Sequence, residues 1–211
     1  MNRNARARKS GTGFDAATTA NETADMRIVG GQLRGRRLNT PRFPGLRPTA
    51  DRLRESLFNI LAHGHDDPIT EARALDLFAG TGALGIEAIS RGAAFALFVD
   101  TSAEARALIR SNVEMFGLGG ATRIYRRDAT DLGPRQANIR PYSLVFADPP
   151  YGEGLAEKAL VSARAGNWLT PDALIVVEEA MEAKFQAPPG YAEIERRSYD
   201  DSELTFLRLR S

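Results

Sequence analysis

The sequence predicts an α/β fold built on a doubly wound, mostly parallel sheet. Short apolar runs alternate with segments of helical length along most of the chain, and five such units are typical of a parallel sheet covered on both faces. The last segment shows two stretches of alternating polar and apolar residues, which predict an antiparallel hairpin at the sheet edge. At 211 residues the chain is long enough for one such domain.

The first 66 residues precede this pattern and fall into two parts. Residues 1–25 contain one aromatic residue and no aliphatic side chain larger than alanine, so we expect a disordered tail. Residues 26–66 predict a small hairpin of two short strands, followed by a helix with Thr49 as its N-cap. Apolar residues recur in that helix with helical spacing, at Leu53, Leu57, Ile60 and Leu61.

Residues 67–211 form the α/β body of the prediction. Its strands are expected at 74–78, 95–99, 122–125, 143–147 and 173–177, and its terminal hairpin at 191–209. The segments between the first five strands are rich in Ala, Glu and Arg and have helical length. We therefore expect one domain here, with residues 26–66 as an appendage to it.

Charge is unevenly distributed, although the net charge is only +1. Residues 26–54 hold eight arginines and one acid, a balance of +7, whereas residues 55–211 hold sixteen basic and twenty-three acidic residues, a balance of −7. A basic segment on an acidic body is typical of polyanion binding, because arginine pairs with phosphate in a bidentate way and the contacts release counterions. A solvated basic face would have the same composition, so charge alone leaves both interpretations open.

Composition excludes several classes of protein. The absence of cysteine excludes a disulfide framework, thiolate catalysis and thiolate metal sites. Two histidines are too few for a zinc centre unless carboxylates complete it, so no metal is expected. The longest apolar run, Ala93–Val99, is too short to span a membrane. The lack of cysteine suits a reducing compartment, so we expect a cytoplasmic protein.

A glycine-rich segment closes the first expected strand and opens the helix that comes next. It runs from Asp76 to Gly85, and its glycines let the backbone turn tightly and approach a ligand, although an ordinary strand-to-helix connection would also contain them. Asp76 precedes the first glycine, where a carboxylate would repel a pyrophosphate and attract an ammonium group. This position favours a ligand with an amino-acid moiety.

Two further acids follow the next two expected strands. Asp100 is placed to accept both hydroxyls of a ribose, and Asp128, followed by Ala129, is placed near an adenine amino group. Ligands of an open parallel sheet bind beyond the carboxyl ends of its strands, so the order ammonium, ribose, adenine predicts S-adenosylmethionine. The predicted cofactor-binding residues are Asp76, Phe78, Gly80, Thr81, Gly82, Asp100, Asp128 and Ala129.

The fourth expected strand is followed by Asp148, Pro149, Pro150 and Tyr151, which are the predicted catalytic residues. The prolines fix φ and leave carbonyl oxygens at the strand end. Asp148 and the Pro149 carbonyl can both accept hydrogen bonds from one exocyclic amine, and Tyr151 offers a plane on which a base can stack. This arrangement frees the amine lone pair for attack on a sulfonium methyl group. A rigid surface loop is the alternative interpretation.

The Asp-Pro-Pro-Tyr segment and the glycine-rich segment together resemble the class I S-adenosylmethionine-dependent N-methyltransferases. The runs 34–38, 45–49 and 51–59 are similar to the bacterial 16S rRNA guanine-N2 methyltransferase family. The resemblance covers roughly 26–210 and implies a Rossmann-like fold and methylation of guanine N2 in 16S rRNA, within 30S particles or late assembly intermediates. It implies that 26–66 binds the RNA, and we expect a monomer. The predicted RNA-binding residues are Arg34, Arg36, Arg37, Arg47 and Arg52.

Three other functions remain as alternatives. A DNA adenine-N6 methyltransferase would use the same amine-acceptor chemistry, but this chain has no insertion large enough for a sequence-reading domain. A nicotinamide oxidoreductase is disfavoured by Asp76 at the glycine turn and by the Asp-Pro-Pro-Tyr segment. A non-catalytic RNA-binding assembly factor is disfavoured because all four strand-end acids are present.

Overall fold

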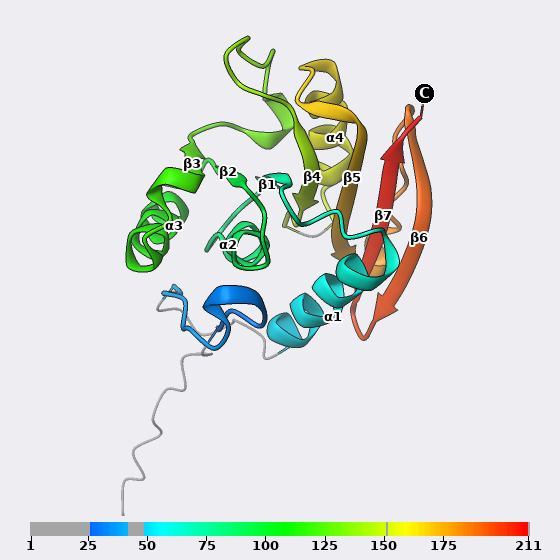
Figure 1. Cartoon of the computed structure of the whole chain (residues 1–211). Helices are drawn as coiled ribbons and strands as arrows, with labels where there is room; N and C mark the ends of the chain where they lie inside the picture. Colours follow the sequence, from blue (N-terminus) through cyan, green and yellow to red (C-terminus); the bar gives the residue numbers. More distant parts are fainter. Residues whose placement is uncertain (1–25, 42–48, 151, 211) are drawn as a thin grey trace, which may run out of the picture.

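The computed structural model describes residues 26–41, 49–150 and 152–210, so the expected tail, Arg47 and Tyr151 lie outside the described residues. Within the described part, seven strands form one sheet in the order β3-β2-β1-β4-β5-β7-β6 (Figure 1). The strands are β1 (Arg73–Leu77), β2 (Phe95–Val99), β3 (Thr122–Tyr125), β4 (Tyr142–Ala147), β5 (Leu169–Ala180), β6 (Tyr191–Tyr199) and β7 (Ser202–Leu209). The α-helices are α1 (Thr49–Gly64), α2 (Ala83–Ser90), α3 (Ala103–Phe116) and α4 (Leu155–Ala165).

The pairing of the strands confirms the predicted sheet. Strands β1 to β5 pair in parallel, whereas β7 pairs antiparallel with both β5 and β6. Strand β5 is longer than the predicted run 173–177, because it begins at Leu169 beside β4 and extends to Ala180 as the partner of β7. Helix α1 includes Thr49 as its first residue, one position earlier than the predicted cap implies.

The expected N-terminal hairpin is present with less strand structure than predicted. Arg27 and Arg37 form an isolated antiparallel bridge, and the Leu38 N–H donates to the Met26 carbonyl at 2.9 Å. A 3₁₀ turn, η1 (Gly31–Leu33), replaces regular strand between them. Gly31 has a φ of +73°, and a Cβ at this position would lie 1.9 Å from the Ser90 carbonyl oxygen. The turn therefore packs on α2 closely enough that only glycine fits at this position.

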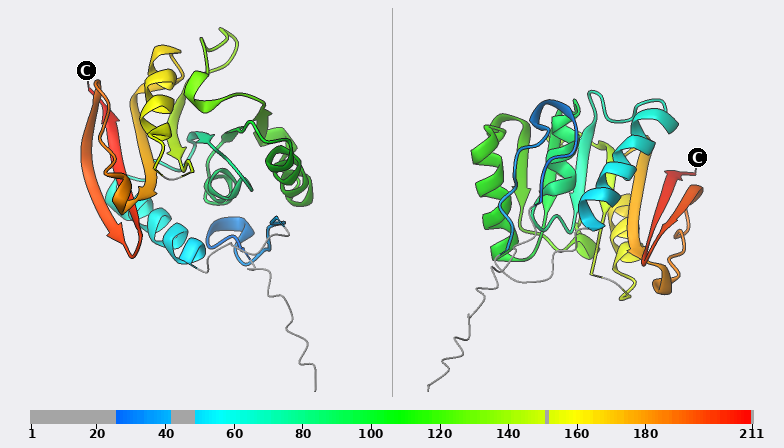
Figure 2. Two further views of the ribbon diagram at one scale, coloured as in Figure 1. Left: turned by 180° about the vertical axis from the view of Figure 1, so that it is seen from behind. Right: turned by 90° about the horizontal axis from the view of Figure 1, so that it is seen from below.

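Helices cover both faces of the sheet (Figure 2). Helices α1, α2 and α3 and the N-terminal segment share one buried cluster with one face, and α4 packs on the other. Strand alternation assigns Ala74 to the first face and Leu75 and Leu77 to the second. Met26, Ile28 and Leu38 belong to the first cluster, so the N-terminal segment lies against the body. The division of the chain at residue 66 stays a prediction.

None of the helices in the described part of the chain combines the length and the apolar character needed to cross a bilayer.

Candidate active site

A cleft of about 1040 Å³ lies at the carboxyl edge of the sheet, bounded by β1, β4, α2, α3 and the N-terminal segment. A second hollow of about 600 Å³ adjoins it, and Phe78, Gly80, Ser102 and Asp148 line both. Each parallel strand ends at this edge, so the segments that follow the strands converge there.

The two hollows bring together most of the predicted cofactor residues. The first is lined by Asp76, Phe78, Gly80 and Thr81. The second is lined by Phe78, Gly80, Asp100, Asp128 and Ala129. Gly82 lines neither hollow, and it precedes α2 with a φ of +79°, a conformation that favours glycine.

The turn between β1 and α2 is held by Asp100. The Gly80 N–H donates to one carboxylate oxygen of Asp100 at 2.9 Å, and the Ser102 N–H donates to the other at 2.8 Å. Asp100 therefore fixes both the glycine turn and the start of α3. Phe78 at the beginning of the turn has a φ of +61°, which is rare for an aromatic residue and indicates a backbone held by its surroundings.

Asp76 lies inside β1, one residue before its end, as expected from the predicted strand 74–78. Its side chain is 1% exposed, and one carboxylate oxygen accepts the Gly85 N–H at 2.9 Å. Burial raises the pKa of Asp76 to about 8, and the charge of Asp100 adds to the rise, whereas the Gly85 bond opposes it. Asp76 thus has a carboxyl group whose ionised form would be stabilised by a cation in the cleft.

Asp148 follows β4 and faces both hollows. Although this side chain is open to the cleft, the surrounding protein displaces enough water to raise its pKa well above the usual value. Glu178, Asp76 and Glu179 raise it further through their charges. Pro149 and Pro150 line only the second hollow, next to Asp148.

Glu178 lines the same cleft and was missed in the sequence motifs. The signal was available, because it is an acid directly after the expected strand 173–177, as Asp148 is after 143–147. In the structure Ala147 and Val177 are the last paired residues of β4 and β5, so Asp148 and Glu178 each come directly after this pair.

The predicted RNA-binding arginines in the described residues, Arg34, Arg36, Arg37 and Arg52, are exposed. Arg36 also contacts α3, where its guanidinium donates to the Met115 carbonyl at 3.2 Å and lies 4.7 Å from the centre of the Phe116 ring. Part of its contribution is therefore structural.

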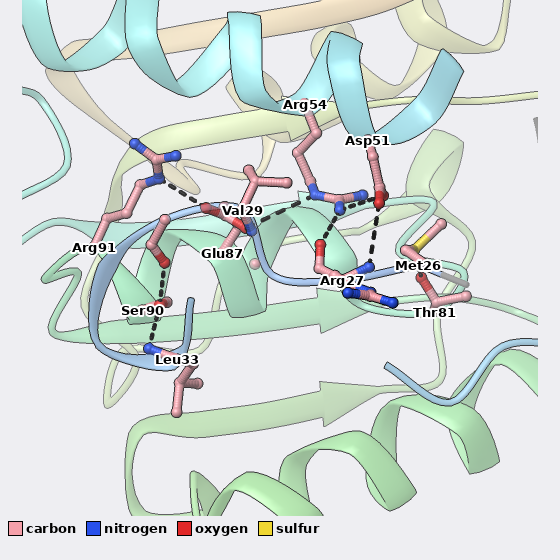
Figure 3. Close-up of polar contacts among 12 residues, drawn as sticks. Met26, Arg27, Val29, Leu33, Asp51, Arg54, Thr81, Glu87, Ser90 and Arg91 are labelled. Atoms are coloured by element: carbon pink, nitrogen blue, oxygen red, sulfur yellow. Dashed lines mark hydrogen bonds and ion pairs between the residues drawn. The ribbon is translucent and has the colours of Figure 1, made fainter. Parts of the chain in front are cut away.

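Arg54 is an exception to the idea of a uniformly exposed basic block. It is 4% exposed and donates to the Arg27 carbonyl and, at 2.7 Å, to Asp51 (Figure 3). Its Nε lies 3.8 Å from the carboxylate of buried Glu87. This arginine joins the N-terminal segment, α1 and α2, so its charge is already compensated inside the protein.

Among the residues that the structure describes, no group of three or more acidic or histidine side chains is arranged to hold a metal ion.

Comparison with known proteins gives consistent results along most of the chain. The family model described as conserved hypothetical protein 95 matches residues 26–208. Ribosomal RNA small subunit methyltransferase D of Escherichia coli is 39% identical over 168 residues, covering 80% of this chain and 81% of that protein. The protein of the same name from Haemophilus influenzae is 32% identical over 181 residues, covering 85% and 92%. The solved Escherichia coli structure of yhhF, to which a methyltransferase activity is ascribed, has a TM-score of 0.74 at 33% identity, covering 88% of this chain and 98% of that one. This likeness confirms the predicted Rossmann-like methyltransferase fold.

Proposed function

The chain belongs to the conserved hypothetical protein 95 family, and from that premise we propose that it is an S-adenosylmethionine-dependent methyltransferase acting on guanine N2 in 16S rRNA. The names of the Escherichia coli and Haemophilus influenzae relatives support ribosomal RNA of the small subunit as the substrate. The observation that carries the chemistry is the position of Asp148, which faces both the glycine turn and the hollow lined by Asp100 and Asp128.

The residues of the cleft fit the cofactor. Asp76 is buried with a raised pKa and accepts a bond from Gly85, and an ammonium group would stabilise its charge. Asp100 and Asp128 line the adjoining hollow, where their carboxylates suit ribose hydroxyls and an adenine amino group. When bound, S-adenosylmethionine supplies an activated methyl group to this site.

The chain's own contribution to the reaction is to position and deprotonate the target amine. Asp148 and the Pro149 carbonyl accept hydrogen bonds from the amine, which keeps its lone pair available. The amine must lose a proton on methylation, and the raised pKa of Asp148 makes its carboxylate a suitable acceptor. The base must leave its stack or lie in an open loop to reach this position.

Methyl transfer from labelled S-adenosylmethionine tests the proposal. The protein is incubated separately with deproteinised 16S rRNA, unmodified 30S particles and duplex DNA, and the nucleosides are then separated. We expect label in N2-methylguanosine from rRNA or from 30S particles, and that comparison also identifies the assembly state of the substrate. Label in N6-methyladenine from DNA, or RNA binding without any transfer, would contradict the proposal.

Cofactor affinity should depend on pH through Asp76. Its pKa of about 8 means that the carboxyl group is mostly protonated at pH 7, and binding an ammonium group favours the ionised form. Affinity should therefore rise from pH 6 towards pH 8, by at most about tenfold per unit for one linked proton. Calorimetric titration of wild type and Asp76→Asn across this range isolates the contribution of Asp76, because all other ionisable groups are the same in the two proteins. Equal pH slopes for the two proteins would exclude this role.

RNA binding should weaken when exposed arginines of residues 26–54 are removed. Arg34 and Arg52 are exposed, so we expect Arg34→Gln with Arg52→Gln to lower RNA affinity and flatten its salt dependence by about two units or fewer, one per lost phosphate contact. The control is Arg197→Gln, which changes an exposed arginine of the edge strand β6 that pairs with Glu195 at 2.6 Å and lies outside residues 26–54. RNA titrations at several salt concentrations provide the measurement. A larger effect from the control would show that RNA binds elsewhere.

A further inference from the structure

A buried amide connects the basic N-terminal segment to the glycine turn. Asn112 lies on α3 and is 0% exposed. Its Nδ2 donates to the Asn39 carbonyl at 3.1 Å and to the Thr81 carbonyl at 3.0 Å, and its Oδ1 accepts the Asn39 N–H at 2.7 Å. Both N–H groups and the oxygen of this amide are thus used, and each bond goes to the main chain of one of these two residues.

The two residues that Asn112 joins belong to different functional parts. Thr81 lies between the two glycines of the turn, and Asn39 lies at the end of the described N-terminal segment. Both line the cleft of about 1040 Å³, together with Thr40 and Pro41. The segment proposed to bind RNA is therefore also one wall of the cleft proposed to hold the cofactor.

A second contact joins the same two parts at the other end of the segment. The Thr81 hydroxyl donates to the sulfur of Met26 at 3.7 Å. Met26 is itself tied to Leu38 through the main chain, at 2.9 Å. The Glu87 and Ser90 contacts anchor the segment on α2, but they do not touch the glycine turn (Figure 3). Among the described residues, Asn112 thus links the segment to the turn through hydrogen bonds that are shorter than the contact between Thr81 and the Met26 sulfur.

We propose that Asn112 is a positioning residue that couples RNA binding by the N-terminal segment to cofactor binding at the glycine turn. The inference rests on the proposed function, because it needs both ligands. RNA that holds the segment in place fixes the main chain of Asn39, and Asn112 transmits this order to Thr81. Because the main chain of the turn is then already ordered, it loses less conformational entropy when the cofactor binds, and the cofactor binds more tightly. The effect is reciprocal, so the cofactor must strengthen RNA binding by the same factor.

The test measures this factor directly. The probe is S-adenosylhomocysteine, which is not turned over, and its dissociation constant is determined with and without a saturating amount of the RNA or 30S particle that wild type methylates. We expect wild type to bind the probe at least about fivefold more tightly in the presence of RNA. For Asn112→Ala we expect the ratio to fall to within twofold of one. The same ratio should be found when RNA is titrated with and without the probe.

Ser111→Ala is the matched control. Ser111 accepts a hydrogen bond from the Asn39 side chain at 2.9 Å on the exposed side of α3, so this substitution loosens the same segment without touching Asn112. We expect it to retain the coupling factor of wild type. If Asn112→Ala bound both ligands more weakly but kept the coupling factor of wild type, the role of Asn112 would be structural and the inference would be wrong.

Hydrogen exchange on wild type provides a test that does not depend on a variant folding. Binding of S-adenosylhomocysteine should slow hydrogen exchange at the Asn39 N–H, which donates a hydrogen bond to Asn112. Binding of RNA should slow exchange at the Gly80 N–H, which donates a hydrogen bond to Asp100. If wild type forms N2-methylguanosine but shows a coupling factor of one and no such protection, the inference is wrong and the proposed function stands. If wild type forms no N2-methylguanosine, the proposed function itself has failed.

Discussion

Asp148→Ala is expected to lower the rate of methyl transfer by a factor of about 10² to 10³, the usual effect of removing one group that stabilises developing charge in a transition state. The substitution removes the acceptor that holds the target amine and takes its proton, because Asp148 faces both hollows at the end of β4. The effect should appear in the rate of a single turnover with labelled cofactor. Cofactor affinity should stay close to that of wild type, because the base is the proposed partner of this carboxylate.

The control for Asp148→Ala is Asp172→Ala. Asp172 is exposed near the amino-terminal end of β5, so the same substitution is made away from the cleft. We expect it to retain full activity. Calorimetry with S-adenosylmethionine completes the test: an Asp148→Ala protein that has lost cofactor binding as well as transfer would assign this carboxylate to the cofactor.

Local patterns predict the sheet well because each strand is fixed mainly by its own residues. The run 95–99 is apolar throughout and becomes β2 with the same bounds, since a strand buried between two neighbours needs apolar residues on both faces. The N-terminal hairpin is predicted less well. Its turn is determined by the approach of Gly31 to Ser90 on α2, a contact between residues far apart in the sequence.

The same distinction applies to the site. Asp100, Asp128 and Asp148 were predicted because each follows a strand, and the carboxyl ends of parallel strands converge at one edge. Asn112 carries no such signal, because an asparagine within a helix is identified as a connector only when its partners Asn39 and Thr81 are seen. Arg54 counted as a free positive charge in the sequence, and only the structure shows that Glu87 and Asp51 compensate it.

Glu87 provides the second large prediction, because it is the buried acid that holds the N-terminal segment on α2. Its side chain is 0% exposed, accepts the Val29 N–H at 2.9 Å and pairs with Arg91 at 2.8 Å. Arg54 lies on its other side at 3.8 Å. We expect Glu87→Leu to lower the free energy of unfolding by about 3–5 kcal/mol, because it leaves a buried arginine less compensated and a main-chain donor without its acceptor.

Denaturant unfolding of Glu87→Leu and of the exposed-site control Glu114→Leu on α3 measures this effect, and the control should change stability by about 0.5 kcal/mol or less. A double-mutant cycle with Arg54→Met then separates the ion pair from the loss of the Val29 bond. Because the less compensated charge of Arg54 contributes to the cost of Glu87→Leu, we expect the double variant to be less destabilised than the sum of the two single variants. Additive effects would mean that Arg54 is stabilised by Asp51 and the Arg27 carbonyl alone, and that Glu87 acts only through Val29 and Arg91.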